Sequence, residues 1–372
     1  MTDRQACIIL NLLPGIGSAR LQAMLEQFGT PSEILKRSVD ELGQVRNVPA
    51  KLAQKIADWR TEVNYDDEIN MAERAGVKII TLYDDDYPQI LKGIYDPPVC
   101  LYVRGTLPDF NYNTIAVVGS RRMSVYGRKM ARHLSEAAAY AGWKVISGLA
   151  FGIDAEAHQA TLDAKGITVA VLGGGLARVH PQEHIPLARN IVENGGALIS
   201  EYPMNFPVSR QSFPRRNRIV SGLSQAVLVV EAGLNSGALL TANIALEQGK
   251  SIFAIPGQAD NPQAKGCHQL IKNGAKLTES FDDILEDFEF LPGFSACEAA
   301  GGYVGTELQE TAMTSVLDEC EQQIINSLDK GQKTVDELSA QTGLNTGKLL
   351  SLLMKLEIKK LINQLPGKVF SR

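Results

Sequence analysis

Short apolar segments recur along the middle of the chain, and most of them end in glycine or a small polar residue. They occupy residues 115–119, 144–148, 168–175, 197–201, 226–232 and 251–257. Stretches with apolar residues at helical spacing separate several of them, as in residues 128–142. Because strands that alternate with helices are joined by crossovers, this pattern predicts an α/β fold with a doubly wound, mainly parallel sheet. Continuous apolar strands also fit a sheet that is covered on both faces.

The segments on either side of this region have different patterns. Residues 1–63 carry apolar residues at helical spacing, and residues 64–105 hold two short strands that we interpret as an edge extension of the sheet. Residues 291–314 are rich in glycine, alanine and serine, which predicts a flexible linker. Three helices and a hairpin are expected in residues 315–372, a combination typical of a winged helix-turn-helix. The predicted domains are therefore 1–63, 64–290 and 315–372, with the linker between the last two.

The turn between the first two predicted helices, LPGIG at residues 13–17, contains two glycines. Backbone amides in such a turn point outward at the start of the next helix, so the turn resembles a helix-hairpin-helix element that grips DNA phosphates. A second, weaker copy occupies residues 45–56 but has no glycine in its turn. The front segment is therefore predicted to be SAM-like or helix-hairpin-helix-like. The alternative is a helical bundle in which glycine serves only the geometry of the turn.

The composition restricts the function in two respects. The formal net charge of −5 gives no overall attraction to nucleic acid, so DNA binding would require a local basic patch. The five cysteines form no CxxC pair and no zinc-type spacing with histidine, which argues against a metal site and suits a reducing cytosol. Neither a signal peptide nor a membrane span is expected. We predict a cytoplasmic protein without a metal, a cofactor or a membrane partner.

Polar groups suited to an anion follow the first parallel strand directly. Gly119 allows backbone amides to approach a phosphate, and Ser120 offers a hydroxyl. Arg121 and Arg122 can form bidentate, charge-assisted hydrogen bonds. In an open α/β sheet such groups lie at the carboxyl edge, where ligands bind. The sequence has neither the GxGxxG turn with its ribose-binding acid nor a Walker motif, so NAD binding and ATP hydrolysis are not expected.

Further small-residue loops are expected at the same edge of the sheet. The loop at residues 147–154 contains Gly148, and a glycine triplet occupies residues 173–175. A small-residue turn at residues 235–242 opens a helix, and its candidate binding residues are Asn235, Ser236, Gly237 and Thr241. Small residues also serve tight turns, but several such loops at one edge favour a phosphate-binding site.

A second arginine cluster, SRQSFPRRNR at residues 209–218, contains no acidic residue. Phe213 lies among its arginines, which are Arg210, Arg215, Arg216 and Arg218. Arginines interleaved with an aromatic residue suit a single strand of nucleic acid, because the charges bind the backbone and the ring stacks on any base. If both arginine clusters meet at one edge of the sheet, the ligand carries several negative charges.

Not every residue of this cluster is expected to contact a ligand. At least one of Arg216 and Arg218 is expected to be structural and to pair with an acid inside the domain. Glu201 and Glu231 are the candidate partners. Asn217 is expected to cap a helix or to hold a turn.

Candidate catalytic groups are few. Asp154 and His158 lie four residues apart on one predicted helix face, which could suggest metal binding or acid–base chemistry. No third ligand lies nearby, and His158 is expected to satisfy a local hydrogen bond. His180 and His184 are expected to be structural in the same way. Because no GxSxG or Cys-His signature is present, we predict no catalytic residue and no enzyme.

Several motifs, in this order along the chain, resemble the DprA/Smf family of DNA-processing proteins. They include VVGSRRMSVYG, SGLAFGIDAEAHQATL, FPRRNRIVSGLS and VVEAGLNSGALLTANIALEQGK. The resemblance implies an extended Rossmann-like domain that binds single-stranded DNA without sequence preference and without catalysis. It also implies that the protein protects the strand and loads a RecA-type recombinase on it during natural transformation. A single-strand-binding protein is a candidate further partner.

The resemblance also assigns residues. The implied DNA pocket contains Gly119, Ser120, Arg121, Arg122, Arg210, Phe213, Arg215 and the turn at residues 235–241. A homodimer is implied through residues 266–275, with His268, Leu270 and Ile271 as candidate contacts. The chain departs from the family at His180, where relatives usually have a tyrosine before the proline, which puts a stacking role there in doubt.

Two alternatives remain open. A nucleotide-metabolising enzyme, similar to nucleoside monophosphate phosphoribohydrolases, would use the same phosphate-binding edge and would need a carboxylate at the sugar, for which Glu231 is the candidate. A winged-helix regulator with a nucleotide-sensing domain would bind specific duplex DNA through its tail. The sequence leaves open whether the front hairpin contacts DNA and what the winged helix binds.

Overall fold

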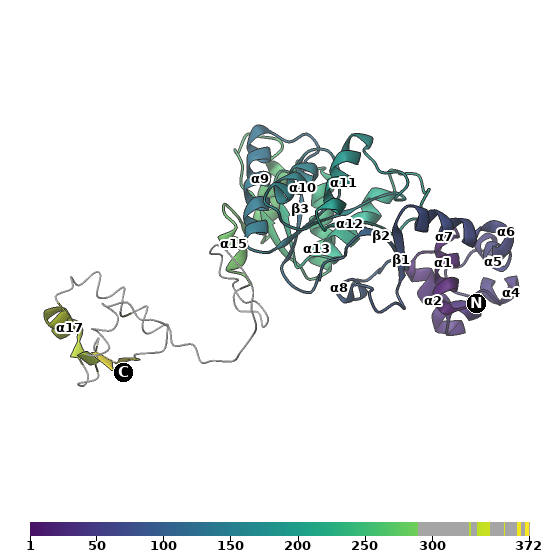
Figure 1. Cartoon of the computed structure of the whole chain (residues 1–372), viewed down its shortest axis with the longest axis horizontal. Coiled ribbons are helices and arrows are strands. Elements are labelled where there is room, and N and C mark those ends of the chain that lie inside the picture. The colour runs from purple at the N-terminus through teal and green to yellow at the C-terminus, as the bar shows by residue number, and fades with distance from the viewer. Residues whose placement is uncertain (289–326, 329–332, 343–352, 354–362, 366–368, 372) are drawn as a thin grey trace. The chain divides into compact units, whose positions relative to one another are not determined.

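The computed structural model describes residues 1–288, 327–328, 333–342, 353, 363–365 and 369–371. The chain forms two compact units, Met1–Ala300 and Gly301–Arg372, which are drawn in Figure 1 and are described separately below. The predicted linker at 291–314 lies outside the described residues, and so does the third predicted helix of the tail except for Leu353. No helix in the described segments is both long enough and apolar enough to cross a membrane.

A nine-stranded sheet organises the first unit. Its strands lie in the order β1-β2-β6-β5-β4-β3-β7-β8-β9. Their bounds are Val77–Thr81, Cys100–Gly105, Thr114–Val118, Lys144–Ser147, Thr168–Val171, Ala197–Ser200, Ala226–Val229, Ser251–Ala254 and Lys276–Leu277 for β1 to β9. The strands from β3 to β9 are parallel, whereas β1 and β2 add an antiparallel edge next to β6. The predicted α/β class, the mainly parallel sheet and the edge extension are confirmed.

Helices cover both faces of this sheet, as Figure 1 shows. One face packs against α8 (Gln89–Lys92), α12 (Ser212–Gly222), α13 (Gly237–Glu247) and α14 (Lys265–Lys272). The other packs against α9 (Val125–Tyr140), α10 (Ile153–Asp163), α11 (Ile185–Glu193) and α15 (Asp282–Leu285). This two-sided cover explains why the central strands are apolar throughout, since both faces are buried.

The N-terminal helices share a hydrophobic core with the β1–β2 edge of the sheet. These helices are α1 (Asp3–Leu12), α2 (Ser18–Phe28), α3 (Pro31–Ile34), α4 (Val39–Gly43), α5 (Ala50–Ala57), α6 (Trp59–Glu62) and α7 (Tyr65–Arg74). Buried side chains such as Ile8 and Ile56 belong to the same cluster as Tyr102 on β2. The front segment is therefore continuous with the sheet in its packing and has no separate core.

Two equivalent turns join the front helices in pairs. Gly15 in the first turn has φ +105°, and Asn47 in the second has φ +64°. Arg20 clasps both turns because it donates to the carbonyl of Gly15 and, at 2.8 Å, to that of Asn47. Asparagine is the residue other than glycine that adopts this left-handed conformation most readily. The turn of the second hairpin copy, which has no glycine, therefore also contains a residue with a positive φ.

The chain reverses its direction across the sheet at β3. From β3 the crossovers lead through α9 and α10 to β4 and β5, and then through α11 to β6. After α12 the chain enters β7, which lies on the other side of β3. The carboxyl ends of β3 and β7 therefore flank a topological switch point, the position at which open α/β sheets bind ligands.

The described part of the second unit agrees with a winged helix. Helix α17 (Val335–Thr342) follows β10 (Lys333–Thr334), and β12 (Val369–Ser371) lies between β10 and β11 (Asn363–Leu365). Thr334 accepts from the Glu337 amide, and Glu337 accepts from the Thr334 amide at 2.8 Å. This reciprocal capping makes Thr334 the residue at which the helix begins.

A buried histidine packs near the starts of β4 and β5. His158 on α10 is fully buried, and its Nδ1 lies 2.7 Å from the hydroxyl of Thr168. That hydroxyl donates to the Val145 carbonyl, so Nδ1 carries the proton of the neutral ring. Nε2 is then a buried lone pair without a partner in the described part of the chain. Burial, together with the nearby charge of Arg216, lowers the pKa of His158 to about 3.

The neutral form of His158 predicts a loss of stability in acid. Since unfolding restores the ordinary pKa of 6.5, the unfolded chain binds one more proton than the folded chain below that pH and down to about 3. This contribution is complete above the unfolded pKa and falls with the pH, by about 2 kcal/mol at about pH 5. His158→Leu should remove this part of the pH dependence. Urea unfolding at neutral and acid pH checks it, and equal losses in both proteins would contradict the assignment.

Candidate nucleic-acid interface

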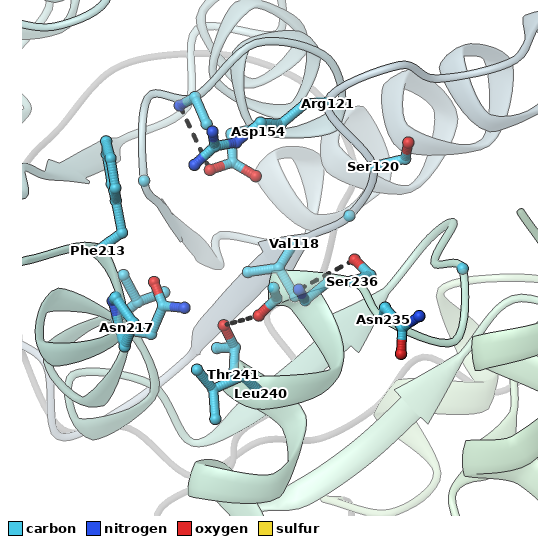
Figure 2. Close-up of a pocket in the computed structure, with 18 of the residues that line it drawn as sticks. Val118, Ser120, Arg121, Asp154, Phe213, Asn217, Asn235, Ser236, Leu240 and Thr241 are labelled. Atoms are coloured by element: carbon cyan, nitrogen blue, oxygen red, sulfur yellow. Dashed lines mark hydrogen bonds between the residues drawn. The ribbon is translucent and has the colours of Figure 1, made fainter. Parts of the chain in front are cut away.

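A pocket of about 500 Å³ lies at the switch point between β3 and β7. The loop after β3, the loop after β4, the first turns of α12 and the loop that opens α13 form its walls (Figure 2). We call it the switch pocket. Of the predicted DNA-binding residues, it is lined by Gly119, Ser120, Arg121, Arg122, Gly148, Phe213, Arg216, Asn217, Asn235, Ser236, Gly237 and Thr241. Two of its arginines come from the first sequence cluster and one from the second.

Hydrogen bonds of Ser120 fix the loop after β3, and the two arginines that follow it are exposed. The Ser120 amide donates to the Glu231 carbonyl at 2.7 Å. The Ser120 hydroxyl accepts from the Arg122 amide at 3.1 Å and donates to Gln263 at 3.3 Å. Arg121 and Arg122 are exposed, and within the described chain neither forms an ion pair. Their guanidinium charges are therefore free to meet an anion.

An arginine and an aromatic ring stack at the wall of the switch pocket. The guanidinium carbon of Arg121 lies 5.0 Å from the ring centre of Phe213, within the range of a cation–π contact. Both residues also line a smaller adjoining cavity, together with Gly173, Arg178 and His180. The His180 ring lies 6.4 Å from that of Phe213 and is tilted by 50° to it, so these two rings are not stacked. The first and second arginine clusters thus meet at Phe213.

Arg216 forms the floor of the switch pocket and is only 4% exposed. Its Nη1 donates to the carbonyls of Gly148 and Val171, each at 2.5 Å, and its Nε donates to Asn217 at 3.2 Å. Burial lowers the pKa of Arg216, and Asp154 opposes that change. No carboxylate of the described residues lies within ion-pair distance of this guanidinium. Arg216 is therefore structural and also presents a buried positive charge to the pocket.

The N-terminus of α13 completes the opposite wall. Ser236 caps the helix by accepting from the Ala238 amide at 3.1 Å, and Thr241 donates to the Gly237 carbonyl at 3.2 Å (Figure 2). Asn235 lies at the exposed rim of the same loop. The positive end of this helix therefore faces the pocket, an arrangement that favours anions.

Three predicted arginines do not reach the switch pocket. Arg218 lies 3.0 Å from Asp96 and 2.5 Å from Glu201 in ion pairs, which confirms the expectation that an arginine here pairs with Glu201. The placement of Arg218 speaks against its assignment as a DNA-binding residue. Arg215 lines a separate groove with Arg218 and the turns of the front hairpins, and Arg210 is exposed outside the pocket.

Asn217 and Leu270, one of the candidate dimer residues, also differ from expectation. Asn217 lies inside α12, where its side chain holds Arg216, and it neither caps the helix nor forms a turn. Leu270 is 5% exposed and belongs to the core of its own chain, so it cannot serve as an interface contact in this conformation. Ile271 packs at the margin of the same core, and His268 contacts the Gly257 carbonyl at 3.0 Å.

The candidate catalytic residues are separated by the structure. The carboxylate of Glu231 is buried, accepts from the Ser124 amide at 2.9 Å and does not line the switch pocket. His158 lies in the core, whereas Asp154 lines the pocket. Among the residues that the structure describes, no group of three or more potential ligands could hold a metal ion. The sequence does not predict Asp154 as a pocket residue, because its spacing from His158 indicates only a shared helix face.

Comparison with known proteins agrees with this architecture. A family model for DNA recombination-mediator protein A matches residues 78–289, and one for the DprA winged helix domain matches residues 309–368. A model for the SAM-like helix-hairpin-helix tandem matches residues 9–58. The chain belongs to the DprA/Smf family. Membership supports a DNA-processing role as a recombination mediator, and it confirms the predicted SAM-like front and winged-helix tail.

Three relatives illustrate the match to the DprA/Smf family. Protein Smf of Escherichia coli is 38% identical over 79% of this chain and 77% of its own length. The crystal structure of DprA from Streptococcus pneumoniae superposes with a TM-score of 0.67 at 32% identity, over 78% of this chain and 99% of that one. A Helicobacter pylori DprA structure, described for its single-stranded DNA binding mode, has a TM-score of 0.51 at 26% identity, over 57% of this chain and 96% of that one.

The loop that precedes α10 predicts a site-specific loss of stability. Gly152 has φ +80°, and a Cβ there would collide with the Ser120 carbonyl and the Arg121 backbone. Gly142 also has a positive φ, but a Cβ there would meet nothing within 4 Å. Gly142→Ala should cost about 1–2 kcal/mol of backbone strain, whereas Gly152→Ala should cost at least about 3 kcal/mol. Denaturant unfolding measures both, and equal costs would show that the contact with the Arg121 loop is unimportant.

Proposed function

We propose that the switch pocket binds single-stranded DNA without sequence preference. The observation that supports this most strongly is the stack of Arg121 on Phe213, beside the free charge of Arg122 and the buried charge of Arg216. A phosphate can be held by the arginines and the α13 N-terminus, while a base stacks on the phenylalanine ring. Since every base has a flat face and every nucleotide has a phosphate, neither contact depends on sequence.

The family relationship supports the wider role. The Helicobacter pylori relative is described as binding single-stranded DNA, and family membership supports recombination mediation. The protein would protect an incoming strand in the cytoplasm and hand it to a RecA-type recombinase during natural transformation, with a single-strand-binding protein as a further partner. The role requires no catalysis, and the carboxylate of Glu231, on which the enzymatic alternative depends, is enclosed beneath α9.

The oligomeric state is part of this proposal. A homodimer through the region around α14 would place two switch pockets on one strand. With Leu270 in the core, the exposed apolar side chain of this region is Leu277, which is 44% exposed on the terminal strand β9. Ile271 and His268 would then contribute only at the margin of such an interface.

The proposed role of the pocket predicts two different effects on binding. Arg121→Ala should weaken binding of oligonucleotides of any sequence and lower the slope of log affinity against log salt by about 0.7, because one phosphate contact is lost. Phe213→Ala should cost about 1–3 kcal/mol with little change in this slope, because stacking is lost instead. Fluorescence anisotropy with single-stranded oligonucleotides over a salt series measures both quantities.

Arg104→Ala provides a matched control for this experiment. Arg104 is exposed on β2, opposite Leu198 near the start of β6, and thus lies at the other edge of the sheet from the pocket. The Arg104→Ala substitution changes the net charge by the same amount as Arg121→Ala, and oligonucleotide binding should remain unchanged. If all three variants bind like the wild-type protein, or if duplex DNA binds better than single strands, the proposed function is wrong.

A further inference from the structure

The switch pocket contains one carboxylate among its three arginines. Asp154 is 7% exposed and lines the pocket, although its ligand is expected to be an anion. Figure 2 shows its carboxylate beside the side chain of Arg121. A negative group in an anion pocket lowers the affinity for any phosphate, so its position there requires a reason.

The structural role of Asp154 explains only part of this position. Its Oδ2 accepts from the Ala150 amide at 3.4 Å, and the residue lies in the first turn of α10, where an acid interacts favourably with the helix dipole. These contacts explain why an acid begins this helix. They do not explain why the carboxylate borders the space in which the phosphate would lie.

Within the described part of the chain, the carboxylate of Asp154 is in no ion pair. Burial raises the pKa of its carboxyl, while Arg216, the amides of Ala150 and Gly148, and Arg121 favour the ionised form. Neither arginine forms an ion pair with it, since the guanidinium of Arg216 donates to carbonyls and that of Arg121 lies over Phe213. In its ionised form the carboxylate therefore acts directly on whatever anion enters the pocket.

The charge of a phosphate depends on how it is esterified. An internal phosphodiester of a DNA strand carries one negative charge, whereas a terminal phosphomonoester carries nearly two above its second pKa of about 6. Near a buried carboxylate the additional charge is strongly unfavourable, because the effective dielectric constant is low. We propose that Asp154 is a specificity-determining residue that makes the switch pocket accept phosphodiesters and reject phosphomonoesters, including free nucleoside monophosphates.

This inference rests on the proposed DNA-binding function and deepens it. Three arginines and a helix N-terminus would bind free mononucleotides as well as a DNA strand, and mononucleotides would then compete for the site. Asp154 lowers the affinity for both but penalises the doubly charged competitor more. Asp154 would therefore distinguish a pocket that prefers a DNA strand from a pocket that prefers nucleoside monophosphates.

A competition experiment with two matched probes tests the inference. Thymidine 5′-monophosphate and its methyl phosphodiester differ by one charge and one methyl group, and each displaces a labelled oligothymidylate at about pH 8. For the wild-type protein the diester should compete better by at least about threefold. In Asp154→Asn this preference should disappear or reverse. Asp163→Asn, an exposed change of the same charge on the same helix, should keep it.

The outcomes separate this inference from the proposed function. If the wild-type protein is displaced equally well by both probes, or better by the monoester, the inference is wrong whatever the variants do. If Asp154→Asn does not fold, Asp154→Ser serves in its place, and Asp154→Glu should retain the preference. A preference that survives in a folded, uncharged variant also overturns the inference. Loss of pocket-dependent oligonucleotide binding, tested by Arg121→Ala, is instead a failure of the proposed function.

Discussion

The site depends on the hydrogen bonds that the buried guanidinium of Arg216 donates to two backbone carbonyls. They join helix α12 to the ends of β4 and β5 through the carbonyls of Gly148 and Val171. A buried charge requires such hydrogen bonds, and Gly148 must lack a side chain because a Cβ there would collide with the guanidinium. Phe213 lies one turn earlier on the same helix, so the hydrogen bonds of Arg216 also fix the position of Phe213. Because Phe213 is fixed in this position, Arg121 can stack on its ring, and the two arginine clusters meet there.

Helical periodicity divides the second arginine cluster between two sites. Phe213, Arg216, Asn217 and Val220 follow one another at the spacing of one helix face, and all of them line the switch pocket. Arg215 and Arg218 share a different face and line the groove beside the front hairpins. Residues that are adjacent in the sequence RRNR therefore have different roles. Arg216 supports the pocket, whereas Arg218 connects α12 to Asp96 and Glu201.

The main features of the fold could be predicted because they depend on local patterns. Apolar runs that end in glycine mark the parallel strands, and their order placed the loops at residues 119–122 and 235–241 on one edge. The separate roles of the arginines in residues 209–218 could not be predicted, because they depend on the helix α12 that most of this segment forms. With helical spacing applied, the pocket-facing residues of α12 follow from the sequence. Strand β9, with two residues, is too short to leave a pattern.

Other features depend on tertiary contacts that no local pattern contains. The resemblance to the family makes Leu270 a candidate interface contact, but its side chain belongs to the core of its own chain. Asn47 replaces glycine in a left-handed turn, which only its equivalence to Gly15 reveals. Asp154 lies more than thirty positions after Arg121 and more than sixty positions before Arg216 in the sequence. Its place in the pocket therefore depends on the crossovers of the sheet.

The net charge of the chain illustrates the difference between global and local electrostatics. The protein carries a formal charge of −5, yet the switch pocket contains three arginines and one aspartate. Charges farther apart than a Debye length of about 8 Å at physiological ionic strength are largely screened. The acids of the front helices and of the distant surface therefore contribute little at the pocket, where the arginines and the α13 N-terminus dominate. In the proposed function, affinity for a polyanion follows from the side chains that meet at the switch point, and the proposed role of Asp154 is to limit the negative charge of each phosphate that binds there.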